Sequence, residues 1–395
     1  MGRMGRRLRQ YGRVIRMLPV AVFRHFRNSQ SLGMLSLLLC LLLGIILLAI
    51  AKGCSASPAA PHADSILEVP QVSTTSVPTP TPAPVSITLS FAGDCTLGMD
   101  SSFSYDSSFN AYYDAYGPAY FLENVRSIFA ADDLTVVNFE GTLTESTDRA
   151  DKSWAFQGDA QYAQVLTEGA VEAVNLANNH THDYGAQGFL DTQQALDHCG
   201  LVHFGFDDTA LVEVKGVKVG LLGLYTVYTD SSYPETLRSL TSSLRDQGAQ
   251  VIVASFHWGM ENSDIPEDDQ IALAHAAVDA GANLVIGHHP HVLQGIERYR
   301  GSYICYSLGN FCFGGNFDPN DYDTVIVQQT FTVTGSQVDA TGGLHVIPCS
   351  ISSTDTQNNY QPTPAQEDQS QRILDWLRRL SDGLGTENAM DTVTH

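Results

Sequence analysis

Short apolar runs alternate with amphipathic segments along most of the chain. The runs 87–91, 134–137, 251–256 and 284–286 are apolar at nearly every position, which is typical of strands buried on both faces of a parallel sheet. Between such runs, segments like 187–199 repeat apolar residues at helical spacing. The alternation of these two patterns predicts an α/β domain.

The later part of the chain changes this pattern. Residues 217–225 form the second half of a predicted hairpin that turns at Lys215-Gly216. Further strands are expected at 304–308, 324–334 and 343–350, with no helical pattern between them. We therefore expect antiparallel strands in addition to the parallel ones.

The N-terminal segment has a separate character. Residues 1–27 contain eight arginines and no acid, and residues 32–51 form an uncharged apolar run. At about 1.5 Å per residue this run is long enough to span a bilayer, and it exceeds the apolar core of a cleaved signal peptide. The arginines predict a cytoplasmic N-terminus and an extracellular domain on a single-pass cell-membrane anchor. A lipoprotein modified at Cys54 is the alternative.

Composition sets the expected domain boundaries. Residues 55–85 are rich in Ser, Thr, Ala and Pro, so they cannot build a core and are expected to form a stalk. The expected organisation is a basic cytoplasmic tail (1–31), a transmembrane helix (32–51), a stalk (52–85), a folded domain (86–353) and a polar C-terminal tail with a short amphipathic helix (354–395).

Charge and cysteine content exclude some classes of function. Beyond Lys52 the chain has 12 basic residues against 43 acidic ones, which argues against nucleic acid as a partner. The cysteines of the expected domain show no close pairing pattern and no Cys-x-x-Cys. Buried single thiols are therefore expected rather than a disulfide framework or a thiolate zinc site.

Polar segments with metal-ligand chemistry follow the apolar runs. Because working residues of parallel sheets lie just beyond the strand carboxyl ends, these segments can meet at one edge. Carboxylate, amide and imidazole ligands together suit Mn, Fe, Zn or Mg. The segments are Phe91-Ala92-Gly93-Asp94, Asn138-Phe139-Glu140, Asn178-Asn179-His180-Thr181-His182-Asp183, His257-Trp258-Gly259 and Gly287-His288-His289-Pro290-His291.

Each segment also has a structural interpretation. Asp94 alone fits a loop cap, Asn138 and Glu140 fit a hydrogen-bonded strand end, and His257 alone fits a core histidine. The 287–291 segment is the most specific, because three imidazoles within four positions are costly to crowd without a cation. His289 and His291 flank a proline and can point to one side as two ligands.

The order of these motifs resembles a known family. F-A-G-D, N-F-E, N-L-A-N-N-H-T-H-D-Y-G, H-W-G, V-I-G-H-H-P-H and Y-S-L-G-N-F, over roughly 86–315, resemble the CapA-like capsule-synthesis proteins. That family is linked to poly-γ-glutamate capsule and belongs to the calcineurin-like metallophosphoesterase superfamily. The resemblance implies a four-layer αββα metallophosphatase-like sandwich, with a divalent metal at the rim, behind the N-terminal transmembrane helix.

The resemblance also implies roles for particular residues. His180 is expected to be the acid beside the scissile group, with Asp183 as a second catalytic residue. The expected metal ligands are Asp94, Glu140, Asn179, His257, His289 and His291. The expected substrate-binding or pocket residues are Asn138, Asn178, Trp258, His288 and Asn310.

Two departures from the superfamily pattern leave two functions open. The usual Asp-x-His is Asp94-Cys95-Thr96 here, and Gly-Asp-x-x-Asp is replaced by Asn138-Phe139-Glu140. These departures favour an accessory protein of envelope-polymer synthesis or export, working with other polymer-synthesis or export subunits. The retained Asn179-His180 pair favours the alternative, a metal-dependent hydrolase of the phosphoesterase type that acts on an envelope polymer or its carrier.

Overall fold

The computed structural model describes residues 83–228, 230–340, 343–385 and 387–395. The predicted basic tail, transmembrane helix and Cys54 lie outside these ranges, as does nearly all of the stalk. None of the helices within the described ranges combines the length and apolar character that a membrane span requires.

The larger sheet has nine strands and mixes parallel and antiparallel pairs. Its main path runs β18-β17-β15-β1-β3-β6-β7, while β14 pairs with β1 and β16 with β15. β1, β3, β6 and β7 are mutually parallel, whereas β15 and β17 run antiparallel to their neighbours. The strands are β1 (Val85–Thr96), β3 (Leu134–Glu140), β6 (Ala173–Asn175), β7 (Val202–Phe204), β14 (Asn310–Phe313), β15 (Asp323–Thr334), β16 (Gln337–Asp339), β17 (Leu344–Ser350) and β18 (Thr363–Pro364).

The second sheet has six strands in the order β12-β13-β11-β10-β9-β8. Its four central strands are parallel, and each edge strand is one arm of a hairpin. The strands are β8 (Ala210–Val214), β9 (Val217–Tyr225), β10 (Val251–His257), β11 (Leu284–His288), β12 (Ile296–Tyr299) and β13 (Ser302–Cys305). A small third sheet contains β2 (Met99–Asp100), β5 (Phe156–Gly158) and β4 (Thr142–Leu143).

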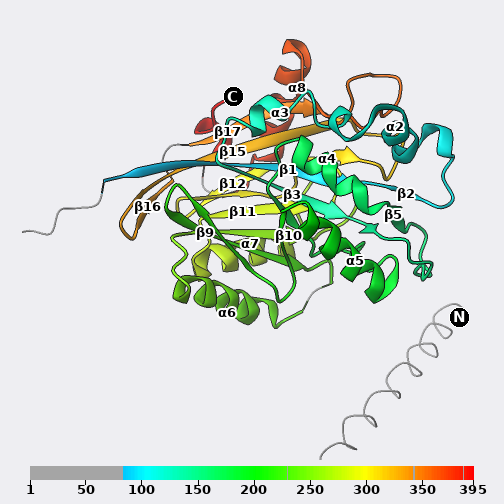
Figure 1. The fold of residues 1–395 in the computed structure, drawn as a ribbon. Helices are drawn as coiled ribbons and strands as arrows, with labels where there is room; N and C mark the ends of the chain where they lie inside the picture. The colour runs from blue at the N-terminus through cyan, green and yellow to red at the C-terminus, as the bar shows by residue number, and fades with distance from the viewer. Residues whose placement is uncertain (1–82, 229, 341–342, 386) are drawn as a thin grey trace, which may run out of the picture. The chain divides into compact units, whose positions relative to one another are not determined.

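Helices α2 to α5 cover the outer face of the nine-stranded sheet, and α6 and α7 cover that of the six-stranded sheet (Figure 1). α5 begins and ends within a few residues of the predicted 187–199 segment. The helices are α2 (Phe109–Tyr116), α3 (Arg126–Phe129), α4 (Gln164–Glu168), α5 (Gly185–His198), α6 (Tyr233–Asp246), α7 (Asp268–Ala280) and α8 (Glu367–Leu380), together with 3₁₀ turns at Tyr105–Ser107, Pro118–Tyr120, Ala160–Ala163 and Ala389–Asp391. The predicted mixed α/β class is confirmed.

Side-chain alternation along the strands explains how the layers pack. On β10, Val251 and Val253 lie in the apolar cluster between the two sheets, whereas Ile252 lies in the cluster beneath α6 and α7. On β3, Val136 faces the other sheet and Val137 faces the cluster beneath α2 to α5. Both faces of each central strand are buried, which accounts for their unbroken apolar runs.

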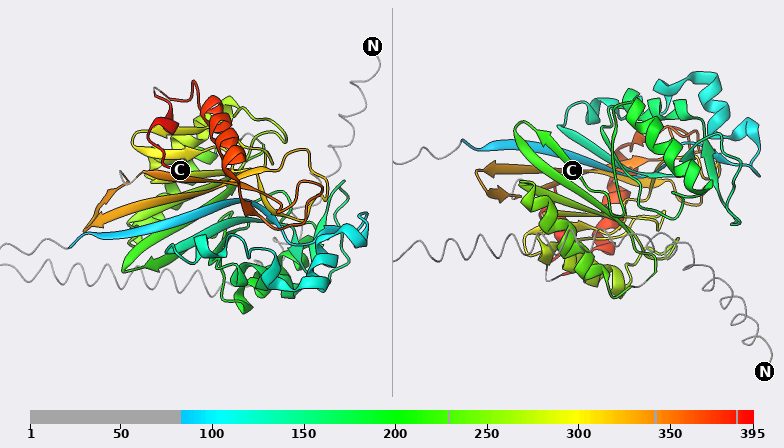
Figure 2. Two further views of the ribbon diagram at one scale, coloured as in Figure 1. Left: turned by 90° about the horizontal axis from the view of Figure 1, so that it is seen from above. Right: turned by 60° about the horizontal axis from the view of Figure 1, so that its bottom comes forward.

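The C-terminal segment belongs to the folded domain. Residues 354–395 are predicted from their composition to form a polar tail, but they contribute Ile373, Leu374 and Leu377 of α8 to the apolar cluster between the sheets. Figure 2 shows α8 lying beside the strands. Arg372 donates hydrogen bonds of 2.5 and 2.7 Å to the two carboxylate oxygens of Asp323, and this fastens α8 to the start of β15.

Candidate metal centre

The candidate centre is the polar end of the layer between the two sheets. Asp94, Asn138 and Glu140 end strands of the nine-stranded sheet, and His257 and His288 end strands of the six-stranded sheet. Backbone register sets Asp94 opposite both Asn138 and Asn310, and sets His257 opposite His288. On β3, β10 and β11 the polar side chains continue the face whose apolar residues lie in the intersheet cluster. On β1 a register shift between Ala92 and Asp94 brings Asp94 onto that face.

Carboxylate and amide groups converge first. The Nδ2 group of Asn138 donates to Asp94 Oδ1 at 2.9 Å and to Glu140 Oε1 at 3.3 Å. Its Oδ1 atom accepts a hydrogen bond of 2.9 Å from Asn175. Asp94, Asn138 and Glu140 are fully buried. The predicted pocket residue Asn138 therefore holds the two carboxylates in place from beneath.

The imidazoles approach these groups from the other sheet. His257 lies between Glu140 and Asn179, with its Nδ1 atom 3.6 Å from Glu140 Oε1 and its Nε2 atom 2.9 Å from Asn179 Oδ1. His291 Nδ1 lies 3.3 Å from Asp94 Oδ2, and the ring centroids of His257 and His289 are 4.6 Å apart. The structure thus brings all six predicted ligands together.

The His289-Pro290-His291 corner has an unusual backbone. His289 has φ of 97° and His291 has φ of 59°, both in the left-handed region that side chains disfavour. His289 N donates to Asp94 Oδ2 at 3.2 Å, and Asn262 N donates to the Pro290 carbonyl at 2.8 Å. Such strained residues persist only when surrounding contacts fix them, and they gather at functional sites.

The charges in the cluster are unbalanced without a cation. Burial and the nearby Asp94 raise the pKa of Glu140 to about 8. Burial lowers the pKa of His291, but Glu140 and Asp94 outweigh it and raise that pKa to about 9. For His289, burial and the neighbouring His291 lower the pKa to about 4. The carboxylate side of the cluster thus takes up positive charge, which a divalent ion could supply instead of protons.

Unpaired buried atoms test whether a metal fits. Within the described ranges, Glu140 Oε2, His289 Nδ1 and Thr96 Oγ1 are buried without a hydrogen-bond partner. Asp94, Glu140 and His291 can each offer a ligand atom to one ion, and Glu261, His289 and His291 can do the same. Hard oxygen and imidazole donors with free lone pairs suit a divalent metal, so the residues present fit one.

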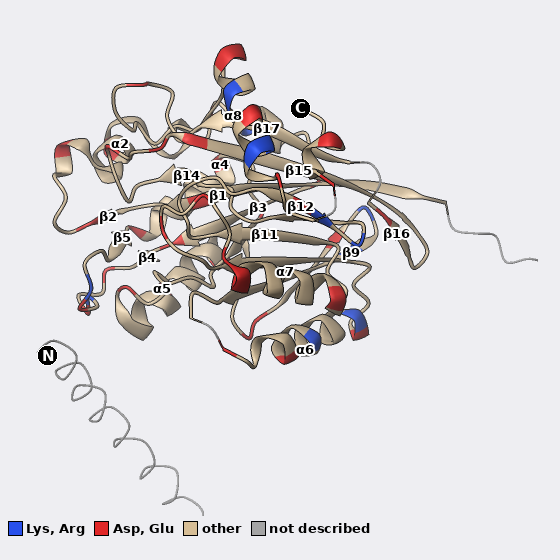
Figure 3. Cartoon of the chain, turned by 180° about the vertical axis from the view of Figure 1, so that it is seen from behind, with Lys and Arg blue, Asp and Glu red and all other residues tan. Residues whose placement is uncertain are grey.

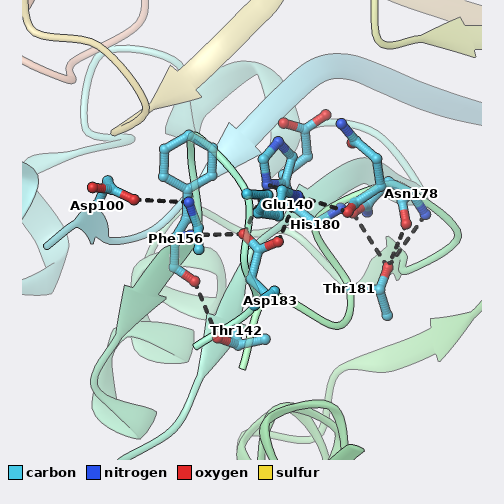
Figure 4. A network of polar contacts seen from close by, with 12 residues as sticks. Asp100, Glu140, Thr142, Phe156, Asn178, His180, Thr181 and Asp183 are labelled. Carbon is cyan, nitrogen blue, oxygen red and sulfur yellow. Dashed lines mark hydrogen bonds and ion pairs between the residues drawn. The ribbon is translucent and has the colours of Figure 1, made fainter. Parts of the chain in front are cut away.

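His180 and Asp183 form a pair beside the cluster (Figure 4). His180 Nδ1 lies 2.7 Å from Asp183 Oδ2. The same oxygen accepts a hydrogen bond of 2.6 Å from the backbone N–H of Phe156. Lys152 Nζ lies 2.7 Å from Asp183 Oδ1 and 3.2 Å from His180 Nδ1. Burial lowers the pKa of His180, although Asp183 opposes this effect.

The other predicted pocket residues have different roles. Asn178 fastens the loop, since its Oδ1 accepts from His180 N at 3.0 Å and its Nδ2 donates to the Phe139 carbonyl at 2.6 Å. Asn310 Oδ1 lies 2.9 Å from His291 Nδ1 and orients that ring. His288 Nδ1 lies 3.1 Å from Asp94 Oδ1. His288 thus contacts the carboxylate half directly.

Trp258 lies on the opposite side of the six-stranded sheet from the candidate centre, where it lines a separate cavity. Its indole stacks on Phe256 at 4.6 Å and donates to the Tyr306 carbonyl at 2.8 Å, in the apolar cluster beneath α7. Trp258 follows His257 directly, so strand alternation turns it to the opposite face of the sheet.

Several residues of the site were not predicted. Glu261 lies two residues past Gly259, and Asn175 is the first residue of the N-L-A-N-N-H segment, but neither was assigned a role. Lys152 and Phe156 come from a loop and a short strand with no periodic signal. Proximity to H-W-G could have suggested Glu261, whereas nothing in the sequence pattern marks Lys152.

Comparison with known proteins agrees with this geometry. Residues 88–315 match the family described as bacterial capsule synthesis protein PGA_cap. The PGA biosynthesis protein CapA of Bacillus subtilis is 33% identical over 267 residues, covering 62% of this chain and 67% of that protein. The capsule biosynthesis protein CapA of Bacillus anthracis is 30% identical over 291 residues, covering 67% of each chain. The chain therefore belongs to the PGA_cap family of bacterial capsule synthesis proteins.

Proposed function

We propose that this protein acts in the synthesis of a capsule or related envelope polymer of the poly-γ-glutamate type, as a metal-dependent hydrolase of a phosphoester or related bond. The names of its relatives support the pathway. The geometry of the site supports the reaction class. On this proposal the domain is an αββα sandwich of the metallophosphatase type.

One observation carries the reaction class. His180 lines the same cavity as His291 of the ligand cluster. The Nδ1 atom of His180 is held by Asp183. A buried histidine with a fixed carboxylate partner is the usual arrangement of a general acid–base residue. A metal that served only to stabilise the fold would have no use for it.

The proposed ligands and the acid have separate tasks. Asp94, Glu140 and His291 would hold a metal, with Asn179, His257 and His289 beside them. When bound, a divalent metal activates water at neutral pH and stabilises developing negative charge. Asp183 accepts the Nδ1 proton of His180, so the Nε2 atom is left to exchange a proton with the leaving group. Lys152 balances the Asp183 charge, and burial favours release of the His180 proton.

The experiment combines metal analysis with a phosphodiester assay on the full chain. His180→Asn should retain its metal and lower turnover on a poor leaving group by about 10²–10⁴, the usual contribution of a positioned acid. A good leaving group, which needs little protonation, should be affected much less. His182→Asn is the matched control, because His182 is exposed and lies two residues away. An equal loss of turnover in His180→Asn and His182→Asn, or no turnover by the metal-bound wild type, would refute the hydrolase proposal.

The accessory role is the second candidate, and one observation favours it. Thr96 stands where the superfamily pattern has an imidazole, and its buried hydroxyl has no partner within the described residues. If polymer export is the role, His180→Asn leaves polymer production intact, while His257→Ala abolishes it through lost metal.

We also propose the location and partners. The arginine-rich segment 1–27 and the apolar run 32–51 support an N-terminal membrane anchor with the domain outside, working with other polymer-synthesis or export subunits. Protease added to intact cells should then remove the domain. A domain protected from protease would contradict this topology.

A further inference from the structure

A cavity of about 260 Å³ opens beside the ligand cluster. His180 and His291 lie at its inner end. Four aromatic residues from separate elements also line it: Phe103, Trp154, Phe156 and Phe313. We call these four residues the aromatic wall.

The aromatic wall is continuous from solvent to the site. Trp154 is 52% exposed, and its ring lies 5.6 Å from Phe103. Phe156 lies 6.5 Å from Phe103 and 4.5 Å from the His180 ring, while Phe313 lies 5.2 Å from the His291 ring. A ligand that packs on this wall therefore extends from the surface to the proposed acid and a proposed metal ligand.

Besides His180 and His291, the polar side chains that line the cavity are amides and acids. Asn262, Asn316 and Asn320 are exposed and supply hydrogen-bond donors and acceptors. Glu261 and Asp321 supply carboxylates, and no lysine or arginine is among the described residues that line the cavity. Apart from His180, His291 and the metal proposed beside them, this lining offers nothing to neutralise a ligand anion, and its carboxylates repel one.

The domain as a whole carries an excess of acidic residues. Figure 3 shows acidic residues on many helices and loops of the domain and fewer basic ones. A run of ligand carboxylates would therefore meet repulsion from this excess of acidic residues. An uncharged ligand group meets no such cost.

We propose that this cavity binds a neutral pyranose ring with hydroxyl or N-acetyl groups, next to the bond that the metal centre cleaves. The apolar C–H face of such a ring packs on the aromatic wall, and its hydroxyl and amide groups bond to the asparagines. The volume suits one ring rather than a length of polymer. The placement beside a cleaved bond rests on the proposed hydrolase, whereas the binding itself does not.

The test measures binding to the full chain by calorimetry with two probes of opposite character. The neutral probe is a tetramer of N-acetylglucosamine, and the anionic probe is a short poly-γ-glutamate. We expect saturable binding of the neutral probe that weakens by about tenfold or more in Trp154→Ala and in Phe103→Ala, because each removes packing area. Trp376→Ala is the control, since Trp376 lies on α8 against Arg379. That variant should bind like the wild type.

A metal-deficient variant separates this inference from the proposed function. His289→Ala should lose metal yet keep its affinity for the neutral probe, because His289 does not line the cavity. Binding of the anionic probe that depends on Trp154, or binding of neither probe, would overturn the sugar subsite while leaving the hydrolase intact. Sugar binding that depends on Trp154 without any hydrolysis would support the subsite and refute the hydrolase.

Discussion

The two large sheets contribute opposite chemistry to the candidate centre. The nine-stranded sheet ends in oxygen donors and amides, namely Asp94, Asn138 and Glu140, whereas the six-stranded sheet ends in the imidazoles His257 and His288, followed by the 289–291 corner. The carboxylate half alone places two buried acids close together, which raises the pKa of Glu140 to about 8 through burial and repulsion from Asp94. The imidazole half alone crowds rings whose burial lowers the pKa values of His257 and His289. Each half is therefore suited to function only when the other half and a cation are present.

The largest effect is expected from breaking the carboxylate half. Glu140→Gln should weaken metal binding by about 100-fold or more, because a charged ligand is lost. The metal-free protein should be as stable as the wild type or more so, since a buried like-charge neighbour of Asp94 is removed. Metal titration and thermal unfolding with and without metal measure both. Glu261→Gln, at an exposed position, is the milder control; an equal effect of the two changes would contradict the central role of Glu140.

Breaking the imidazole half should rank three of its four histidines by their effect on metal binding. His289→Ala and His291→Ala should each weaken metal binding by about 10–100-fold, because each removes a direct ligand. His288→Ala should cost about tenfold, since His288 contacts Asp94 Oδ1 at 3.1 Å and orients that ligand. Metal content after dialysis against a weak chelator gives the ranking. Identical content in all three variants would show that the ligand assignment is wrong.

Lys152, in a loop outside both large sheets, is expected to contribute to turnover through the His180–Asp183 pair. Lys152→Met should lower turnover on a poor leaving group by about tenfold and leave metal content unchanged, because it loosens the His180–Asp183 pair without touching a ligand. Steady-state kinetics alongside metal analysis distinguish this outcome from misfolding. Lys218→Met, at a lysine that contacts the Gln247 carbonyl on the far side of the domain, should behave as wild type.

The smallest effect is expected from Asp100, which bonds to Arg149 and Ala155 and so supports the loop that carries Lys152. Burial raises the pKa of Asp100, but hydrogen bonds from Ala155, Ser102 and Arg149 outweigh it and lower the pKa to about 2. The folded-state pKa is thus below the unfolded one, so the stabilisation is present above about pH 4 and is lost as the pH falls toward 2. Asp100→Asn should cost about 1–2 kcal/mol at pH 7 and flatten this part of the pH dependence of unfolding. If the free energy of unfolding of Asp100→Asn fell with decreasing pH as steeply as that of the wild type, the lowered pKa of Asp100 would be contradicted.

Only part of the candidate centre could be predicted from the sequence. Strand-end motifs placed Asp94, Glu140 and His257 at one edge because apolar runs mark strands and parallel strands share a carboxyl edge. The extension of β1 to Thr96 was not predicted, since it depends on pairing with β3 on one side and with β14, more than two hundred residues away in the chain, on the other. Lys152, Phe103 and Trp154 were missed because loop residues carry no periodicity. Trp258 was placed on the wrong face because a motif names neighbouring residues together, although alternation separates them.

The separation of the two halves along the chain has a consequence for folding. The hydrogen bond from His289 N to Asp94 joins residues 195 positions apart. Contacts of such high sequence separation form late, after the entropy of closing the intervening chain has been overcome by packing. A nascent or partly folded chain therefore contains the carboxylates and the imidazoles but no assembled ligand set. Tight metal binding would then show that the two sheets have packed together. The rate of metal binding during refolding would therefore measure the rate of the final folding step.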